Sequence, residues 1–201
     1  MRTEVVVLAA GQGTRMRSAR PKVLHEVGGR PMLAHVLDAA RDLDPGRITV
    51  VIGHGADQVQ NALDAGDVTW VHQEQQLGTG HAVAQAGSDF SGADWVVALN
   101  GDVPLLRGET LHQWLAELAA SNAAVGILTA TPADPSGYGR ILRDDRGAVV
   151  GIREEKDATE SERAIGEIFT GTVAVRGARL GPWLDALSAD NAQGEYYITD
   201  V

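Results

Sequence analysis

Residues 5–16 read VVVLAAGQGTRM, and residues 20–24 read RPKVL. The apolar run over residues 5–10 predicts a buried strand, and the two glycines after it predict a turn. Glycine lets backbone N–H groups approach an anion, and Arg15 and Lys22 add positive charge nearby. The combination favours a nucleoside triphosphate ligand and phosphate-transfer chemistry. An ordinary strand-to-helix turn with solvated cations is the alternative reading of the glycines alone.

Two common phosphate-binding motifs do not fit this stretch. The dinucleotide fingerprint needs a third glycine where the chain has Met16, and no Gly-Lys-Ser/Thr follows at the spacing of a P-loop. Neither of these two motifs therefore accounts for the glycine turn.

Composition narrows the class of partner. The 201 residues are 44% hydrophobic and 22% charged, which is typical of a globular chain, and the net charge of −10 argues against a nucleic-acid partner. Cations gather at Arg15, Arg17, Arg20 and Lys22, a local patch that suits a small polyanionic ligand. Cysteine is absent, which excludes thiolate chemistry and disulfides, and no apolar run has the length of a membrane span. We expect a cytoplasmic protein without a membrane partner.

Short apolar runs alternate with helical patterns along the first two thirds of the chain. Strands such as Val5–Leu8 and Trp95–Leu99 are apolar throughout, as in a parallel sheet that is covered on both faces. Residues 1–131 are therefore predicted to form a Rossmann-like, doubly wound α/β sheet. Residues 132–201 show a hairpin pattern around the turn at 144–147 and predict a small antiparallel lobe on the substrate side, within a single domain.

Two segments after predicted strands carry polar groups suited to a nucleotide site. Residues 100–104 read NGDVP, and Asp102 could hold Mg²⁺, which takes one or two protein carboxylates together with phosphate oxygens. Residues 73–82 read QEQQLGTGHA, in which amide side chains can read the edge of a pyrimidine. A plain turn at Asp102 and a polar loop with Thr79 as helix N-cap are the structural alternatives.

These motifs resemble those of the sugar-1-phosphate nucleotidyltransferases, and in particular the bacterial UDP-N-acetylglucosamine pyrophosphorylases, which form the uridylyltransferase half of bifunctional enzymes. The resemblance implies that Arg15 holds the β- and γ-phosphates, that Lys22 neutralises charge at the α-phosphorus, and that Asp102 binds Mg²⁺. Further nucleotide-binding positions follow from the same matches: Leu8, Ala9, Ala10, Gly11, Gly13, Gln73, Gly78 and Thr79.

The second half of the chain matches the sugar-binding motifs of the same family. The matched segments are PSGYGR at 135–140, IREEKDAT at 152–159 and NAQGEYYITD at 191–200. The resemblance implies that Gly139, Glu154 and Thr199 contact the sugar, with Tyr197 as a weaker match. Phe169 stands where the family has an asparagine that hydrogen-bonds the amino sugar, so altered sugar selectivity is expected.

The resemblance implies an enzyme that converts UTP and N-acetylglucosamine-1-phosphate into UDP-N-acetylglucosamine and pyrophosphate, with Mg²⁺ as cofactor. The family continues beyond residue 201 with a second metal ligand, an asparagine, and an acetyltransferase β-helix through which relatives trimerise. The sequence leaves open whether the 201 residues are part of a longer chain, and it does not predict the oligomeric state. Two alternatives stay open: another sugar-1-phosphate uridylyl- or thymidylyltransferase, and a sugar-nucleotide-binding protein with impaired catalysis.

Overall fold

The computed structural model describes residues 1–13 and 16–201. Its strands are β1 (Thr3–Ala9), β2 (Glu26–Val27), β3 (Arg30–Pro31), β4 (Arg47–Ile52), β5 (Thr69–His72), β6 (Trp95–Asn100), β7 (Val125–Ala130), β8 (Arg140–Arg143), β9 (Val149–Arg153) and β10 (Ile168–Arg176). Its helices are α1 (Met32–Asp42), α2 (Ala56–Ala62), α3 (Thr79–Gln85), α4 (Gly108–Ala120), α5 (Glu160–Arg163) and α6 (Gly177–Asp185), with the short 3-10 helices η2 (Lys22–Leu24) and η3 (Ile198–Asp200). None of these helices is long and apolar enough to cross a lipid bilayer.

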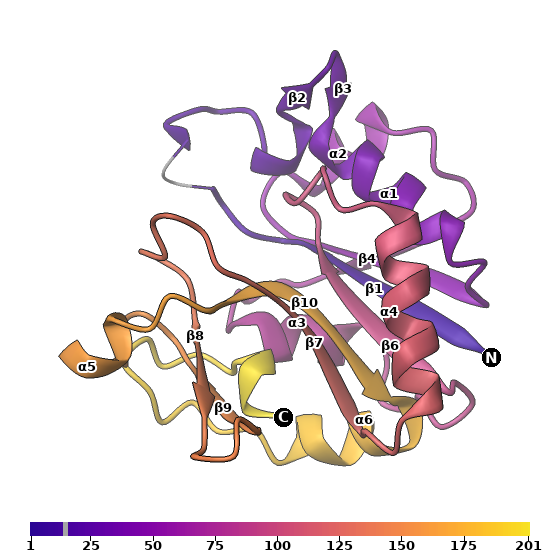
Figure 1. Cartoon of the computed structure of the whole chain (residues 1–201). Coiled ribbons are helices and arrows are strands. Elements are labelled where there is room, and N and C mark those ends of the chain that lie inside the picture. The colour runs from indigo at the N-terminus through magenta and orange to yellow at the C-terminus, as the bar shows by residue number, and fades with distance from the viewer. Residues whose placement is uncertain (14–15) are drawn as a thin grey trace.

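One eight-stranded mixed sheet organises the described part of the chain. Its order is β5-β4-β1-β6-β10-β8-β9, and β7 pairs with β10 (Figure 1). Strands β5, β4, β1 and β6 are parallel, with Val6 level with Thr49 on one side and Ala98 on the other. The strands predicted from continuous apolar runs are confirmed, and they form the centre of the sheet because both of their faces are buried.

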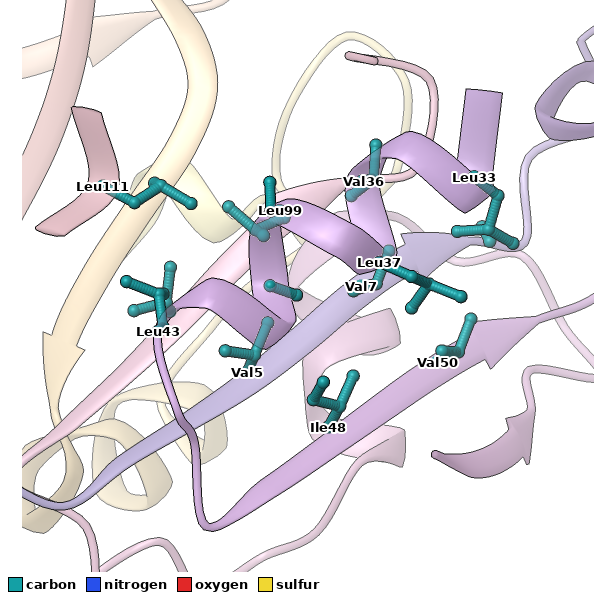
Figure 2. Packing of buried hydrophobic residues seen from close by; sticks show 14 of the residues in the cluster. Val5, Val7, Leu33, Val36, Leu37, Leu43, Ile48, Val50, Leu99 and Leu111 are labelled. Carbon is teal, nitrogen blue, oxygen red and sulfur yellow. The ribbon is translucent and has the colours of Figure 1, made fainter. Parts of the chain in front are cut away.

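Helices cover both faces of this sheet, as the prediction of a doubly wound fold requires. Helix α1 lays Leu33, Val36 and Leu37 on β1 and β4, where they meet a row of buried valines and isoleucines (Figure 2). Helices α3 and α6 contribute to a second buried cluster with Phe90 and Val96. The two clusters fix the position of the parallel strands, and therefore of the loops at their carboxyl ends.

The second half of the chain is joined to the first through β10. This strand runs antiparallel to β6, with Ala174 level with Val97, and its other end pairs with β8 at Ile168. The predicted hairpin is confirmed as β8 and β9, and Asp144 closes its turn by accepting hydrogen bonds from the amides of Arg146 and Ala148. The antiparallel strands thus extend the same sheet and form the far wall of the site.

Candidate functional site

A cavity of about 350 Å³ opens at the carboxyl ends of β1, β5 and β6. Eight predicted nucleotide-site residues line it together with Asp102: Leu8, Ala9, Ala10, Gly11, Lys22, Gln73, Gly78 and Thr79. We call this space the nucleotide cavity. The sheet brings the three loops together because parallel strands end at one edge, and the Gly101 amide donates to the Leu8 carbonyl at 2.9 Å.

Gly13 lies behind Lys22 rather than on the cavity wall. Its φ of +61° is in the left-handed region, and a Cβ at this position would lie 2.6 Å from Lys22 Cβ. Glycine is therefore required for the lysine stem to pack against the turn. Arg15, the predicted partner of the β- and γ-phosphates, lies outside the described residues.

Lys22 and Asp102 form an ion pair between the Lys22 Nζ and an Asp102 carboxylate oxygen. The two side chains are 38% and 27% exposed, so the charges are open to solvent and to a ligand. Among the described residues no group of three His, Asp or Glu side chains is placed to hold a metal ion. Asp102 is the carboxylate that could contribute to a shared cation site, with the Asn100 amide next to it on the cavity wall.

A second cavity, of about 440 Å³, lies on the side of the antiparallel strands. All four predicted sugar-site residues line it: Gly139, Glu154, Phe169 and Thr199. We call this space the sugar cavity. It shares Thr79, Asn100 and Asp102 with the nucleotide cavity, so the two spaces meet at the end of β6. A ligand with two parts could therefore occupy both cavities with its junction at Asp102.

Glu154 is a half-buried carboxylate on the wall of the sugar cavity. The Thr199 hydroxyl donates a hydrogen bond to its Oε1 at 3.2 Å. Burial raises the pKa of Glu154 above the ordinary glutamate value, and the negative charges of Asp157, Asp200 and Glu195 raise it further, against the lowering effect of the Thr199 hydroxyl. The carboxylate can accept hydrogen bonds from a hydroxylated ligand. Because burial disfavours its ionised form, the charged side chain lowers the stability of the fold.

Glu154→Gln is therefore expected to raise the melting temperature at pH 7, by about 2 °C for a chain of this size. Burial raises the pKa of Glu154 in the folded state above the unfolded value of 4.5, so ionisation of this carboxyl destabilises the fold as the pH rises above that value. The gain should consequently be much smaller at pH 4, where the wild-type carboxyl is mostly protonated in both states. Thermal melting at both pH values checks this, with Glu160→Gln, in the exposed helix α5, as the control. An equal shift at the two pH values would contradict the electrostatic explanation.

Phe169 lies at the start of a bulge in β10 and belongs both to the core and to the wall of the sugar cavity. The register of β10 against β7 shifts between Phe169 and Val173, and the Phe169 amide donates to the Gly139 carbonyl at 2.8 Å. Its ring is buried in the second core cluster and also contacts the sugar cavity. Where a polar side chain is expected from the resemblance, this wall is apolar.

The segment 191–200 holds the loop at residues 77–80 in place by backbone hydrogen bonds. The amides of Gly80 and Tyr196 donate to the carbonyls of Tyr196 and Leu77, at 2.7 and 2.8 Å. Gly78 has a φ of +109°, and a Cβ there would lie 2.5 Å from the Tyr196 carbonyl oxygen, so glycine is required. The alternative that Thr79 is a helix N-cap is wrong: Gly78 is the N-cap, and the Thr79 hydroxyl accepts from the Ile198 amide at 3.0 Å.

Three polar residues on the wall of the nucleotide cavity were not predicted from the sequence. Asn100 lines both cavities, Glu195 lines the nucleotide cavity, and Gln76 does so while its amide donates to the Ala10 carbonyl at 2.9 Å. Asn100 carried a usable signal, because it directly follows an apolar strand and precedes Gly101 and Asp102. Gln76 lies in the segment 73–82 and Glu195 in the segment 191–200, but nothing in the sequence distinguished either residue from its neighbours as a cavity residue.

The family model identifies the class of protein to which this fold belongs. Residues 5–192 match the model of the MobA-like NTP transferase domain, and the chain belongs to this family. Over its 201 residues, the chain is 59% identical to the bifunctional protein GlmU of Pseudomonas aeruginosa strain PAO1. It is 56% identical to that of Pseudomonas putida strain GB-1 over the same length. In both cases the match covers 44% of the relative, so the chain spans less than half the length of these proteins. The resemblance drawn from the motifs is thereby confirmed.

A similar solved structure supports the same fold. It is described as a candidate glucose-1-phosphate thymidylyltransferase from Bacillus anthracis, in complex with sucrose. The two structures align with a TM-score of 0.75 at 21% sequence identity, over 98% of this chain and 80% of the other. At this identity the likeness concerns the architecture of the sheet and its covering helices.

Proposed function

We propose that this chain transfers the uridylyl group of UTP to N-acetylglucosamine-1-phosphate and releases pyrophosphate, as a cytoplasmic step in the supply of cell-wall precursors. The observation that carries the proposal is the meeting of the two cavities at Asp102. One cavity is walled by the glycine turn and Gln73, which suits a nucleotide, and the other by Glu154 and Thr199, which suits a sugar. The reacting phosphates of the two substrates would then lie at the junction.

The proposed reaction needs no protein nucleophile. The phosphate oxygen of the sugar-1-phosphate is already an anion, so it can attack the α-phosphorus of UTP directly, and the bond to the β-phosphate breaks as pyrophosphate leaves. Catalysis then consists of alignment and of stabilising the negative charge that develops. Lys22 is the described cation at the junction, and its solvent-open ammonium could turn from Asp102 towards the phosphates.

Magnesium is the divalent cation that the proposed chemistry requires. A single carboxylate at the junction, with the Asn100 amide beside it, is a donor set that suits Mg²⁺ when phosphate oxygens complete its coordination. When bound, the ion would neutralise phosphate charge. Asp102 would hold it, and Lys22 would then be released from its ion pair.

Pyrophosphate release tests the proposal. The protein is incubated with Mg²⁺, UTP and N-acetylglucosamine-1-phosphate, and parallel reactions contain dTTP or CTP in place of UTP, or glucose-1-phosphate as acceptor. We expect the fastest release with the first pair and none after addition of EDTA. Faster release with dTTP or glucose-1-phosphate would assign another substrate pair. Stabilisation by UTP without release from any pair would make the chain a binding protein.

Phe169 provides a test of sugar selectivity. Phe169→Asn is expected to raise kcat/KM for N-acetylglucosamine-1-phosphate by about 10-fold, because a buried hydrogen-bonding group discriminates far better than an apolar wall. It should also lower stability, by about 2–4 kcal/mol, since Phe169 as a whole is only 8% exposed in a packed core. Phe169→Leu, which loses volume without gaining polarity, is the control. Unchanged kinetics in the asparagine variant would contradict the idea that this position limits sugar recognition.

A further inference from the structure

Gln73 has both of its amide hydrogens committed to protein acceptors. It lies at the end of β5 and is 3% exposed, and its Nε2 donates to the Gly78 carbonyl at 3.2 Å and to the His81 Nδ1 at 2.8 Å. A carbonyl can only accept, so the nitrogen of the amide must face Gly78 and cannot exchange places with the oxygen. This pair of contacts fixes the orientation of the amide group.

The second contact fixes the state of His81. Because Gln73 donates to Nδ1, that ring nitrogen carries no hydrogen, and the proton of the neutral imidazole is on Nε2. The Gln85 Nε2, one turn further along α3, lies 3.2 Å from His81 Nε2. Two hydrogen-bearing nitrogens cannot pair, so the Gln85 amide takes the opposite orientation, in which its oxygen accepts the His81 hydrogen. The order Gln85–His81–Gln73 thus forms a chain in which each side chain sets the orientation of the next.

The remaining polar atom of Gln73 is its Oε1. Within residues 1–13 and 16–201 no group donates a hydrogen bond to this oxygen, and Gln73 lines the nucleotide cavity. The site therefore offers a ligand an acceptor on the cavity wall and no donor from this amide. A base that presents a ring N–H can satisfy the oxygen, whereas a bare ring nitrogen would leave two lone pairs facing each other.

We propose that His81 is a positioning residue that turns the Gln73 oxygen towards the base, and that this selects a ring N–H donor. On the proposed function, the donor is N3–H of the uracil of UTP, and thymine shares it. Cytosine has a lone pair at N3 and is disfavoured. The preference for uracil over cytosine therefore depends on His81, although His81 itself needs no contact with the nucleotide.

The experiment compares the kcat/KM values of UTP and CTP in variants of His81. His81→Phe keeps a ring but removes the shorter of the two contacts, so only the 3.2 Å contact with the Gly78 carbonyl still orients the Gln73 amide. We expect the ratio of UTP to CTP to fall by about 10-fold, through a higher KM for UTP with little change in kcat. His81→Asn can place its Oδ1 where Nδ1 was and should restore the wild-type ratio. The matched control is His35→Phe on α1, where His35 contacts the Val27 carbonyl far from both cavities.

Calorimetric binding of UTP and CTP separates this inference from the proposed function. If the wild type forms no pyrophosphate, the proposed function fails, but binding still reports whether His81→Phe narrows the difference between the two nucleotides. If the phenyl variant does not fold, His81→Ala removes the ring without adding volume and is tested in its place. A folded His81→Phe or His81→Ala variant with the wild-type preference would overturn the inference.

Discussion

Asp102→Asn will lower the kcat of pyrophosphate release by about 10³-fold, which corresponds to the several kcal/mol that a bound cation contributes to a phosphoryl-transfer transition state. Asparagine has the size of aspartate but lacks its charge, so it would bind a divalent cation far more weakly. The prediction follows from the place of Asp102 on the walls of both cavities. Activity is measured over a range of Mg²⁺ concentrations, and the variant should need far more Mg²⁺ for half of its residual rate.

Loss of folding does not account for such an effect. The ion pair of Asp102 with Lys22 is partly exposed, and pairs of this kind contribute about 0–1 kcal/mol to stability. The melting temperature should therefore change little. Asp38→Asn is the matched control, because Asp38 also sits in an exposed ion pair, with Arg30 at 2.7 Å, and does not line either cavity. An Asp102→Asn variant with the wild-type kcat and Mg²⁺ dependence would remove the basis for the proposed cation site.

The parallel half of the fold could be predicted because its signals are local. Strands such as Trp95–Asn100 are apolar on both faces, and each ends in a polar or glycine-rich loop. Since parallel strands end at one edge of the sheet, the same reasoning predicts that Gly11 and Asp102 meet. The nucleotide cavity confirms this meeting, although the roles of these residues stay predictions.

The other half could be predicted only in part, because its placement depends on contacts that are distant in sequence. Nothing local in the sequence places β10 beside β6. The pairing of Tyr196 with residues 77–80 is equally non-local. Arg140 is a further example: its side chain is 2% exposed and ion-paired with Glu155 at 2.7 Å, whereas an isolated arginine in a loop motif is normally solvated.

The motif resemblance predicted more of the sugar cavity than residue chemistry alone could. Gly139, Glu154, Phe169 and Thr199 come from four separate segments, and none has a pattern that specifies a sugar site by itself. They converge because β8, β9, β10 and η3 pack together at one end of the sheet. The position of Phe169 among them is what makes the departure from the family testable.

Lys22→Met will lower kcat by about 10²-fold and change the KM for UTP by less than about 3-fold. A charge that acts mainly on the transition state affects turnover, whereas a charge that acts equally on bound substrate affects KM. Methionine keeps the stem that packs against Gly13, so the effect isolates the ammonium group. Lys156→Met is the matched control, because Lys156 is an exposed lysine that contacts Gln193 and does not line either cavity.

The double variant Lys22→Met/Asp102→Asn shows whether the ion pair acts as a unit. If both groups serve the same phosphates, the double variant will be little slower than Asp102→Asn alone, since coupled catalytic groups are strongly non-additive. Additive losses would mean that the two charges act independently. A Lys22→Met variant with a raised KM and the wild-type kcat would contradict the role given to this lysine, because its ammonium would then contribute to UTP binding and not to the stabilisation of charge at the α-phosphorus.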